Sequence, residues 1–124
     1  MIRWAIIDAT GCVTRAGAGQ TLPEGAVELP THLTPEDAVR MRLVDGDWID
    51  RPAIYPPAQS GGTVTYTAPD GAVAEVCDGI TGVILATVAA SGGQIVLEFA
   101  PGAYQIEVNP PAPWMRRADQ VTVA

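Results

Sequence analysis

The strongest pattern in the chain is an alternation of apolar and polar residues on both sides of Pro101-Gly102. In residues 94–99, and again in residues 103–108, every second side chain is apolar and those between are mostly polar. Such period-two alternation marks strands with one buried face, and a Pro-Gly break favours an antiparallel hairpin. The spacing therefore predicts a hairpin over residues 94–108. The hairpin makes the C-terminal half a small all-β module, a type of domain that more often has a binding or structural role than a catalytic one.

Length and composition favour many short strands. A chain of 124 residues suffices for one ordinary domain or two very small ones. A hydrophobic content of 48% is enough for a core, so we do not expect wholesale disorder. The 13 glycines and 11 prolines suit turns between strands and argue against long helices.

The charge of the chain argues against two classes of partner. The net charge is −7, and Arg supplies all the basic residues, because the chain has no Lys. Such a chain is a poor electrostatic match for nucleic acid or an anionic membrane, and it lacks a lysine for Schiff-base chemistry. No stretch approaches the roughly 18 apolar residues of a spanning helix. Asp8 follows the N-terminus too closely for a signal peptide, so we expect synthesis in a cytoplasm.

A Pro- and Gly-rich stretch at residues 52–62 predicts a linker between two modules. In the first module, residues 1–51, we expect a small β-meander with at most one short helix. Its predicted strands cover residues 2–7, 12–15 and 26–29, with a loop at 16–25. A helix begins near Thr34, and a hairpin turns at Asp45-Gly46.

The second module, residues 63–124, reads as a series of strands separated by Pro-, Asp- and Gly-containing turns. Strands are predicted at residues 63–67, 72–77, 82–89, 94–99, 103–108 and 116–123. Residues 82–89 are apolar on both faces, which predicts a central strand covered on both sides. The number and spacing of the strands indicate an antiparallel β-sandwich of the Ig-like or prealbumin-like kind.

Few residues of the chain are candidates for catalysis or metal binding. Asp45, Asp47 and Asp50 surround a turn but lack the spacing of an EF-hand. Glu98 and Glu107 are expected on the wet face of the hairpin, where charge keeps a surface solvated. His32, the single histidine, lies in a Pro-containing loop without a nucleophile motif. We therefore expect no catalytic residues, no cofactor and no metal site.

The two cysteines, Cys12 and Cys77, are 65 residues apart and belong to no metal-ligand motif. In a cytoplasmic chain we expect two reduced thiols that fill small gaps in the core. A disulfide between the two modules stays open as the alternative.

Aromatic and arginine side chains are the best candidates for contact with a partner. Trp48, Tyr55 and Trp114 lie near prolines, where they either anchor a partner or cap the ends of thin cores. Arg116 and Arg117 either engage an acidic neighbour or protect an edge strand from unwanted pairing.

Two parts of the chain resemble known families. Residues 3–13, with 22–26 and the Val-Asp-Gly-Asp-Trp-Ile of 44–49, resemble small phage tail-region proteins of the tail-fibre and fibre-assembly types. Residues 82–86, the Pro-Gly-Ala-Tyr-Gln-Ile-Glu-Val of 101–108 and the Val-Thr-Val of 121–123 resemble PEGA-type and carboxypeptidase-regulatory-like β-sandwiches. Those domains are attachment modules without catalytic residues.

Together the resemblances imply a non-enzymatic virion protein, located in the particle and made in the host cytoplasm. It would act as a tail, fibre or capsid-decorating component by docking and display, in multiple copies beside other virion proteins. The alternatives are a tail-fibre assembly chaperone and a ligand-binding β module that recognises a sugar or calcium. Neither nucleic acid nor membrane is an expected partner.

Overall fold

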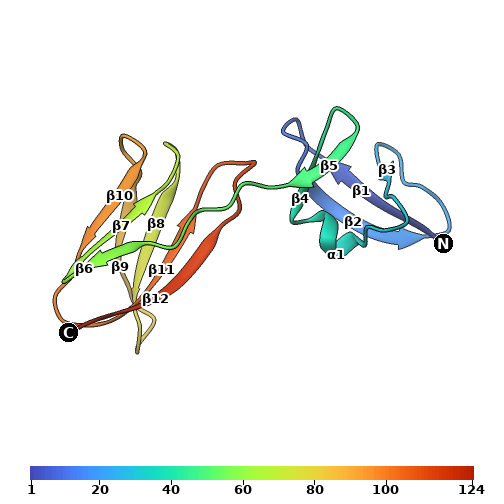
Figure 1. Ribbon diagram of the computed structural model, residues 1–124. Helices are drawn as coiled ribbons and strands as arrows, with labels where there is room; N and C mark the ends of the chain where they lie inside the picture. Colours follow the sequence, from blue (N-terminus) through green and yellow to red (C-terminus); the bar gives the residue numbers. More distant parts are fainter. The chain divides into compact units, whose positions relative to one another are not determined.

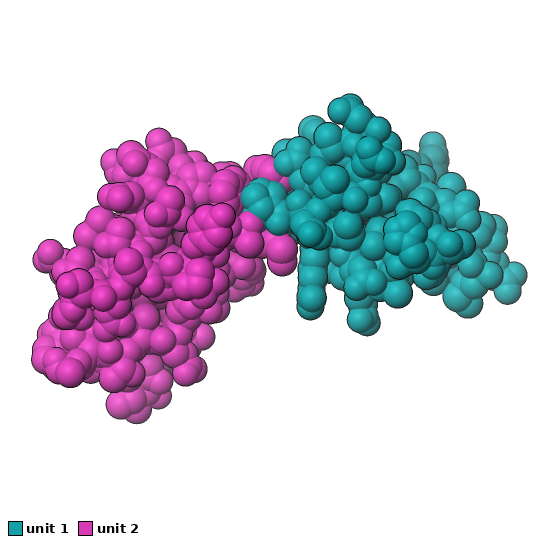
Figure 2. All heavy atoms as spheres, in the orientation of Figure 1, with its two compact units in different colours: residues 1–52 teal, residues 53–124 magenta.

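The computed structural model describes all 124 residues and divides them into two compact units, Met1–Pro52 and Ala53–Ala124 (Figure 2). Nearly all regular structure is antiparallel strand, with one four-residue helix (Figure 1). The all-β fold class predicted from the sequence is thereby confirmed. Each unit has its own hydrophobic core.

The first unit contains a three-stranded sheet and a separate hairpin. The sheet has the order β2-β1-β3, formed by Val13–Gly19, Ile2–Ile7 and Val27–Glu28. The hairpin pairs β4 (Met41–Val44) with β5 (Asp47–Asp50), and helix α1 (Pro35–Ala38) precedes it. The predicted meander with one short helix corresponds to these elements.

Local sequence signals explain the helix and the hairpin turn. The Thr34 hydroxyl oxygen accepts a hydrogen bond from the Asp37 N–H, and the Asp37 carboxylate accepts from the Thr34 N–H. This capping box satisfies two of the amides that are left unpaired at a helix start. Asp45 and Gly46 both have positive φ, at 51° and 83°, as a two-residue type I′ turn requires.

Strand β2 is longer than the sequence predicted. Residues 16–19 were expected in a loop because of their glycines, but they continue β2 and pair with residues 2–5 of β1. The glycine at 17 has a packing reason, since a Cβ there would stand 2.9 Å from the Trp4 ring. Trp4 therefore lies over Gly17, and the composition that suggested a loop instead makes room for an indole.

The second unit is built from two antiparallel sheets. One has the order β10-β7-β6, from Gln94–Glu98, Thr63–Thr67 and Ala58–Ser60. The other has the order β12-β11-β8-β9, from Arg117–Val123, Gly102–Asn109, Val73–Asp78 and Ile84–Ala89. Strands of both sheets contribute to one core, as in the predicted sandwich. Its buried members are Ile54, Val64, Tyr66, Ala68, Ala72, Ala74, Val76, Ile95, Leu97, Ile106, Val108, Val121 and Val123.

The predicted hairpin over residues 94–108 is wrong. Strand β10 pairs with β7, whereas β11 pairs with β8 and β12 in the other sheet. The segment around Pro101 carries the chain from one sheet to the other, and Phe99 stacks on Tyr104 with ring centroids 4.4 Å apart. Alternation identifies which face of a strand is buried, and it leaves the partner strand undetermined.

The strand expected at the centre of a sheet, residues 82–89, lies at an edge instead. It forms β9, whose only sheet neighbour is β8, and most of its side chains are exposed. Apolar residues on both faces therefore did not mark a covered strand here, because β9 has no strand neighbour on its outer side.

The stretch expected to be a linker, residues 52–62, is largely incorporated into the second unit. Ile54 is only 3% exposed and belongs to its core. Residues Ala58–Ser60 form β6, paired with β7. Three prolines precede this strand, which is compatible with an edge position where few backbone amides are needed.

Candidate functional site

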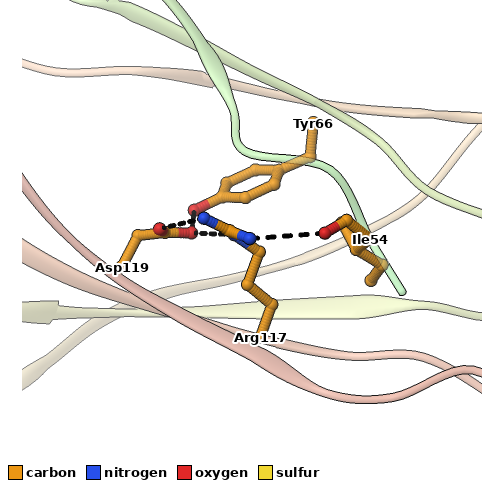
Figure 3. Close-up of polar contacts among 4 residues, drawn as sticks. All are labelled: Ile54, Tyr66, Arg117 and Asp119. Carbon is orange, nitrogen blue, oxygen red and sulfur yellow. Dashed lines mark hydrogen bonds and ion pairs between the residues drawn. The ribbon is translucent and has the colours of Figure 1, made fainter.

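The most organised polar cluster joins Tyr66, Arg117 and Asp119 in the second unit (Figure 3). The Tyr66 hydroxyl donates to Oδ2 of Asp119 at 2.7 Å. Arg117 donates from Nε to Oδ2 at 2.8 Å and from Nη2 to Oδ1 at 2.9 Å, a bidentate pair. Its Nη1 donates to the backbone carbonyl of Ile54 at 3.4 Å. The Asp119 carboxylate therefore links β12 to β7 through Tyr66, and Arg117 adds a contact to the segment around Ile54.

The electrostatics of the cluster follow from its partial burial. Desolvation acts to raise the pKa of the Asp119 carboxyl, but hydrogen bonds from Arg117 and Tyr66 outweigh it and hold the pKa below its usual value. Burial, followed by the hydrogen bond to Asp119, raises the pKa of Tyr66. At neutral pH the cluster is thus a carboxylate, a guanidinium and a neutral phenol.

This cluster ties the two sheets together. Tyr66 comes from β7, whereas Arg117 and Asp119 come from β12 of the other sheet. The Tyr66 ring is completely buried in the core between them. Arg117, expected as a partner contact, has its guanidinium occupied by these internal bonds.

Sequence reasoning missed Tyr66 and Asp119. A signal was present, since Tyr66 shares the inward face of its strand with Val64, and a buried tyrosine hydroxyl needs a polar partner. Asp119 stands two residues after Arg117, on the same face of the last strand.

The other expected contact residues occupy different surroundings. Arg116 is exposed and pairs with Glu107, with Nη2 and Oε2 3.2 Å apart. Tyr55 is 77% exposed, whereas Trp114 is half-buried against the core of the second unit. A parallel bridge between residues 53 and 115 brings their two segments side by side. Trp48 belongs to the first unit, so the aromatic candidates do not form one cluster within a unit.

Trp48 lines a shallow groove of about 420 Å³ in the first unit. The other lining residues come from β3, the loop after it, and the β4–β5 hairpin: Val27, Glu28, Leu29, Pro30, Leu43 and Gly46. Most of them are apolar, and Trp48 also packs against the core below. The groove therefore offers an aromatic and aliphatic floor with one carboxylate among its lining residues.

The residues considered as candidates for catalysis or metal binding do not gather in one place. Glu98 and Glu107 lie in different sheets, so the expectation that they sit on facing strands is wrong. No three His, Cys, Asp or Glu side chains gather in a group that could hold a metal ion, and His32 is exposed. Cys12 and Cys77 are not joined in a disulfide, and each belongs to a different unit.

Fold and cluster together define an all-β protein whose second unit is an antiparallel sandwich closed by a Tyr–Asp–Arg network. No protein-family model, no curated protein and no solved structure matches this chain. None of its helices has the length and apolar character needed to span a membrane.

Proposed function

We propose that this chain is a non-enzymatic structural component of a bacteriophage particle, in the tail, a fibre or the capsid decoration. It would dock through its first unit and display the second. The observation that supports the proposal best is the small core of the first unit. The resemblance of residues 3–13 and 44–49 to phage tail-region proteins supports the choice of particle.

The first unit has few fully buried apolar side chains for its 52 residues. They are Ala5, Leu29, Leu33 and Ala38, and the one further buried apolar side chain of the unit, Cys12, is not part of this cluster. Alanine contributes little hydrophobic free energy on burial compared with leucine or phenylalanine. Units of this size with such small cores are marginal alone and gain stability from association. A small core of this kind is expected of a subunit that is stabilised by assembly with its neighbours.

The Trp48 groove is the docking surface in this proposal. Its apolar floor and single carboxylate suit a partner segment with an apolar anchor and a basic side chain, supplied by another virion subunit. Trp is among the residues most enriched where binding energy concentrates. The partner would remove Trp48 and Leu43 from water and so stabilise the sheet beneath them.

A pull-down of purified particle proteins with the full chain tests this proposal. Reversing the charge at the groove, Glu28→Arg, should weaken capture at least about tenfold. Glu24→Arg is the matched control, because it changes the net charge equally in the same unit but lies outside the groove. Equal capture by both variants would place docking elsewhere.

Mass spectrometry of purified particles separates the proposal from the assembly-chaperone alternative. A structural component stays in the mature particle at a fixed stoichiometry, whereas a chaperone is absent after assembly. A stable monomer that neither binds particle proteins nor occurs in particles would contradict both.

A further inference from the structure

Of the four sheet edges in the second unit, β9 is the only one longer than three residues that carries no charged side chain. Edge strands present unpaired N–H and C=O groups that can pair with another strand, and proteins normally shorten, charge or cover them. Strand β6 has three residues. Strand β12 carries Arg117 and Asp119, and Gln59 donates to its Thr122 carbonyl at 3.0 Å. Strand β10 ends in Glu98.

Strand β9 has none of those charges or covers. It has six residues, Ile84–Ala89, without proline. The Ala90 N–H donates to the Ala72 carbonyl of the β8 side at 2.8 Å. Because backbone groups alternate along an antiparallel strand, the N–H and C=O of Thr87 and Ala89 point to the open side. The register between β8 and β9 shifts by one residue at Leu85, which has no partner residue on β8. Residues 86–89 pair regularly with β8.

Exposed apolar side chains continue along this edge. Ile84 and Leu85 are 58% and 53% exposed, and in the preceding turn Val83 and Ile80 are 58% and 88% exposed. Large aliphatic side chains rarely cluster at a surface without a partner to cover them. At the far end of the strand Ala89 and the following Ala90 are small, and Val88 before them packs against the core.

Charge indicates what kind of partner fits. Residues 79–97 contain no charged side chain, although the whole chain carries −7. Two copies of an acidic protein repel each other over most of their surfaces. The β9 edge itself brings no charge into a contact between two copies, and the Glu75 carboxylate opposite Thr87 lies one strand back from the edge, on β8.

We propose that β9 pairs with β9 of a second copy, antiparallel and about a twofold axis at Thr87. The two four-stranded sheets then become one continuous sheet of eight. Thr87 faces Thr87 of the second copy, and the aliphatic Ile84 and Leu85 face the small residues at 89 and 90. A twofold axis makes such an interface self-complementary, because each large end meets a small one. The inference rests on the second unit alone and is independent of the Trp48 groove.

Sedimentation velocity of the full chain over about 1–300 μM tests the pairing, since edge-strand interfaces are small and concentration-dependent. The wild-type chain should shift from monomer to dimer across this range. Thr87→Lys and Thr87→Glu should each raise the dissociation constant at least about tenfold, because like charges then meet at the axis. An equimolar mixture of the two variants should dimerise again, because opposite charges meet there.

Thr122→Lys is the matched control, since it places the same charge on the opposite edge of the same sheet and should leave the dimer intact. Circular dichroism confirms that each variant is folded. A wild-type chain that stays monomeric at all concentrations would overturn the inference. So would a dimer that survives both Thr87 substitutions, or two folded variants whose mixture does not associate.

Discussion

At the scale of single residues, Asp119 joins the two sheets of the second unit. Its two oxygens accept hydrogen bonds from Tyr66 and from two nitrogens of Arg117, so one carboxylate satisfies a buried phenol and a half-buried guanidinium. Its side chain is 17% exposed, and solvent therefore screens the ion pair less than at an open surface. Removing either neighbour leaves a polar group poorly satisfied, which costs more than the bond itself.

We expect Tyr66→Phe to lower the free energy of unfolding by about 1 kcal/mol and Asp119→Asn by about 2 kcal/mol. The double variant should lose less than the sum of the two, because Asn has one acceptor oxygen in place of two and both substitutions change the Tyr66–Asp119 contact. Urea unfolding followed by circular dichroism measures these values. Glu98→Gln, an exposed carboxylate in the same unit, should change stability by less than about 0.5 kcal/mol. Fully additive effects would mean that the two side chains act independently.

The pH dependence of stability follows from the lowered pKa of Asp119. A folded pKa below the unfolded one means that the folded chain binds fewer protons, so the contribution is complete above the unfolded value. That contribution is lost as the pH falls through the folded value. The stability gap between wild type and Asp119→Asn should therefore be constant from about pH 5 to 7 and shrink below about pH 4. Urea titrations at a series of pH values would reveal it, and a gap independent of pH would contradict the role of the charge.

At the scale of elements, β10 shows how burial alternates along a strand of the sandwich. Ile95 and Leu97 are almost fully buried, whereas Val96 between them is 50% exposed. Their strand pairs with β7 in strict register, with Ile95 opposite Tyr66 and Val96 opposite Thr65. Neighbouring aliphatic residues therefore differ in environment only because the backbone turns their side chains to opposite faces.

Ile95→Ala should cost about 2–5 kcal/mol, because it removes buried methyl groups and leaves a cavity. Val96→Ala should cost less than about 1 kcal/mol, because half of that side chain is already in water. Thermal unfolding of the two variants compares adjacent positions with similar chemistry. Similar losses of stability at both positions would contradict the assignment of Ile95 to the buried face of β10 and of Val96 to its exposed face.

The same elements show what the sequence alone can predict. Alternation identified β10 and β11 with their buried faces, and local signals identified the Thr34 cap and the Asp45-Gly46 turn, because each depends on residues close together in the chain. Strand partners depend on contacts distant in sequence, and this is why β10 and β11 were mistaken for a hairpin and β9 for a central strand. The Tyr66–Asp119 bond spans 53 positions and was missed for the same reason.

At the scale of the whole molecule, the two units differ in how far they can support themselves. The second unit has a continuous core drawn from both sheets and a polar network that links them. The first unit has a small core rich in alanine, beneath an apolar groove. This asymmetry is the physical basis of the proposal that the chain docks through its first unit and displays the second.

Native-state hydrogen exchange of the free full-length chain tests that asymmetry directly. Amides of β7, β8 and β11 should exchange only through opening of the whole second unit. Amides of β1 and β2 should exchange through openings that cost at least about 2 kcal/mol less. Equal protection in both units, or greater protection in the first, would contradict the view that the first unit depends on assembly.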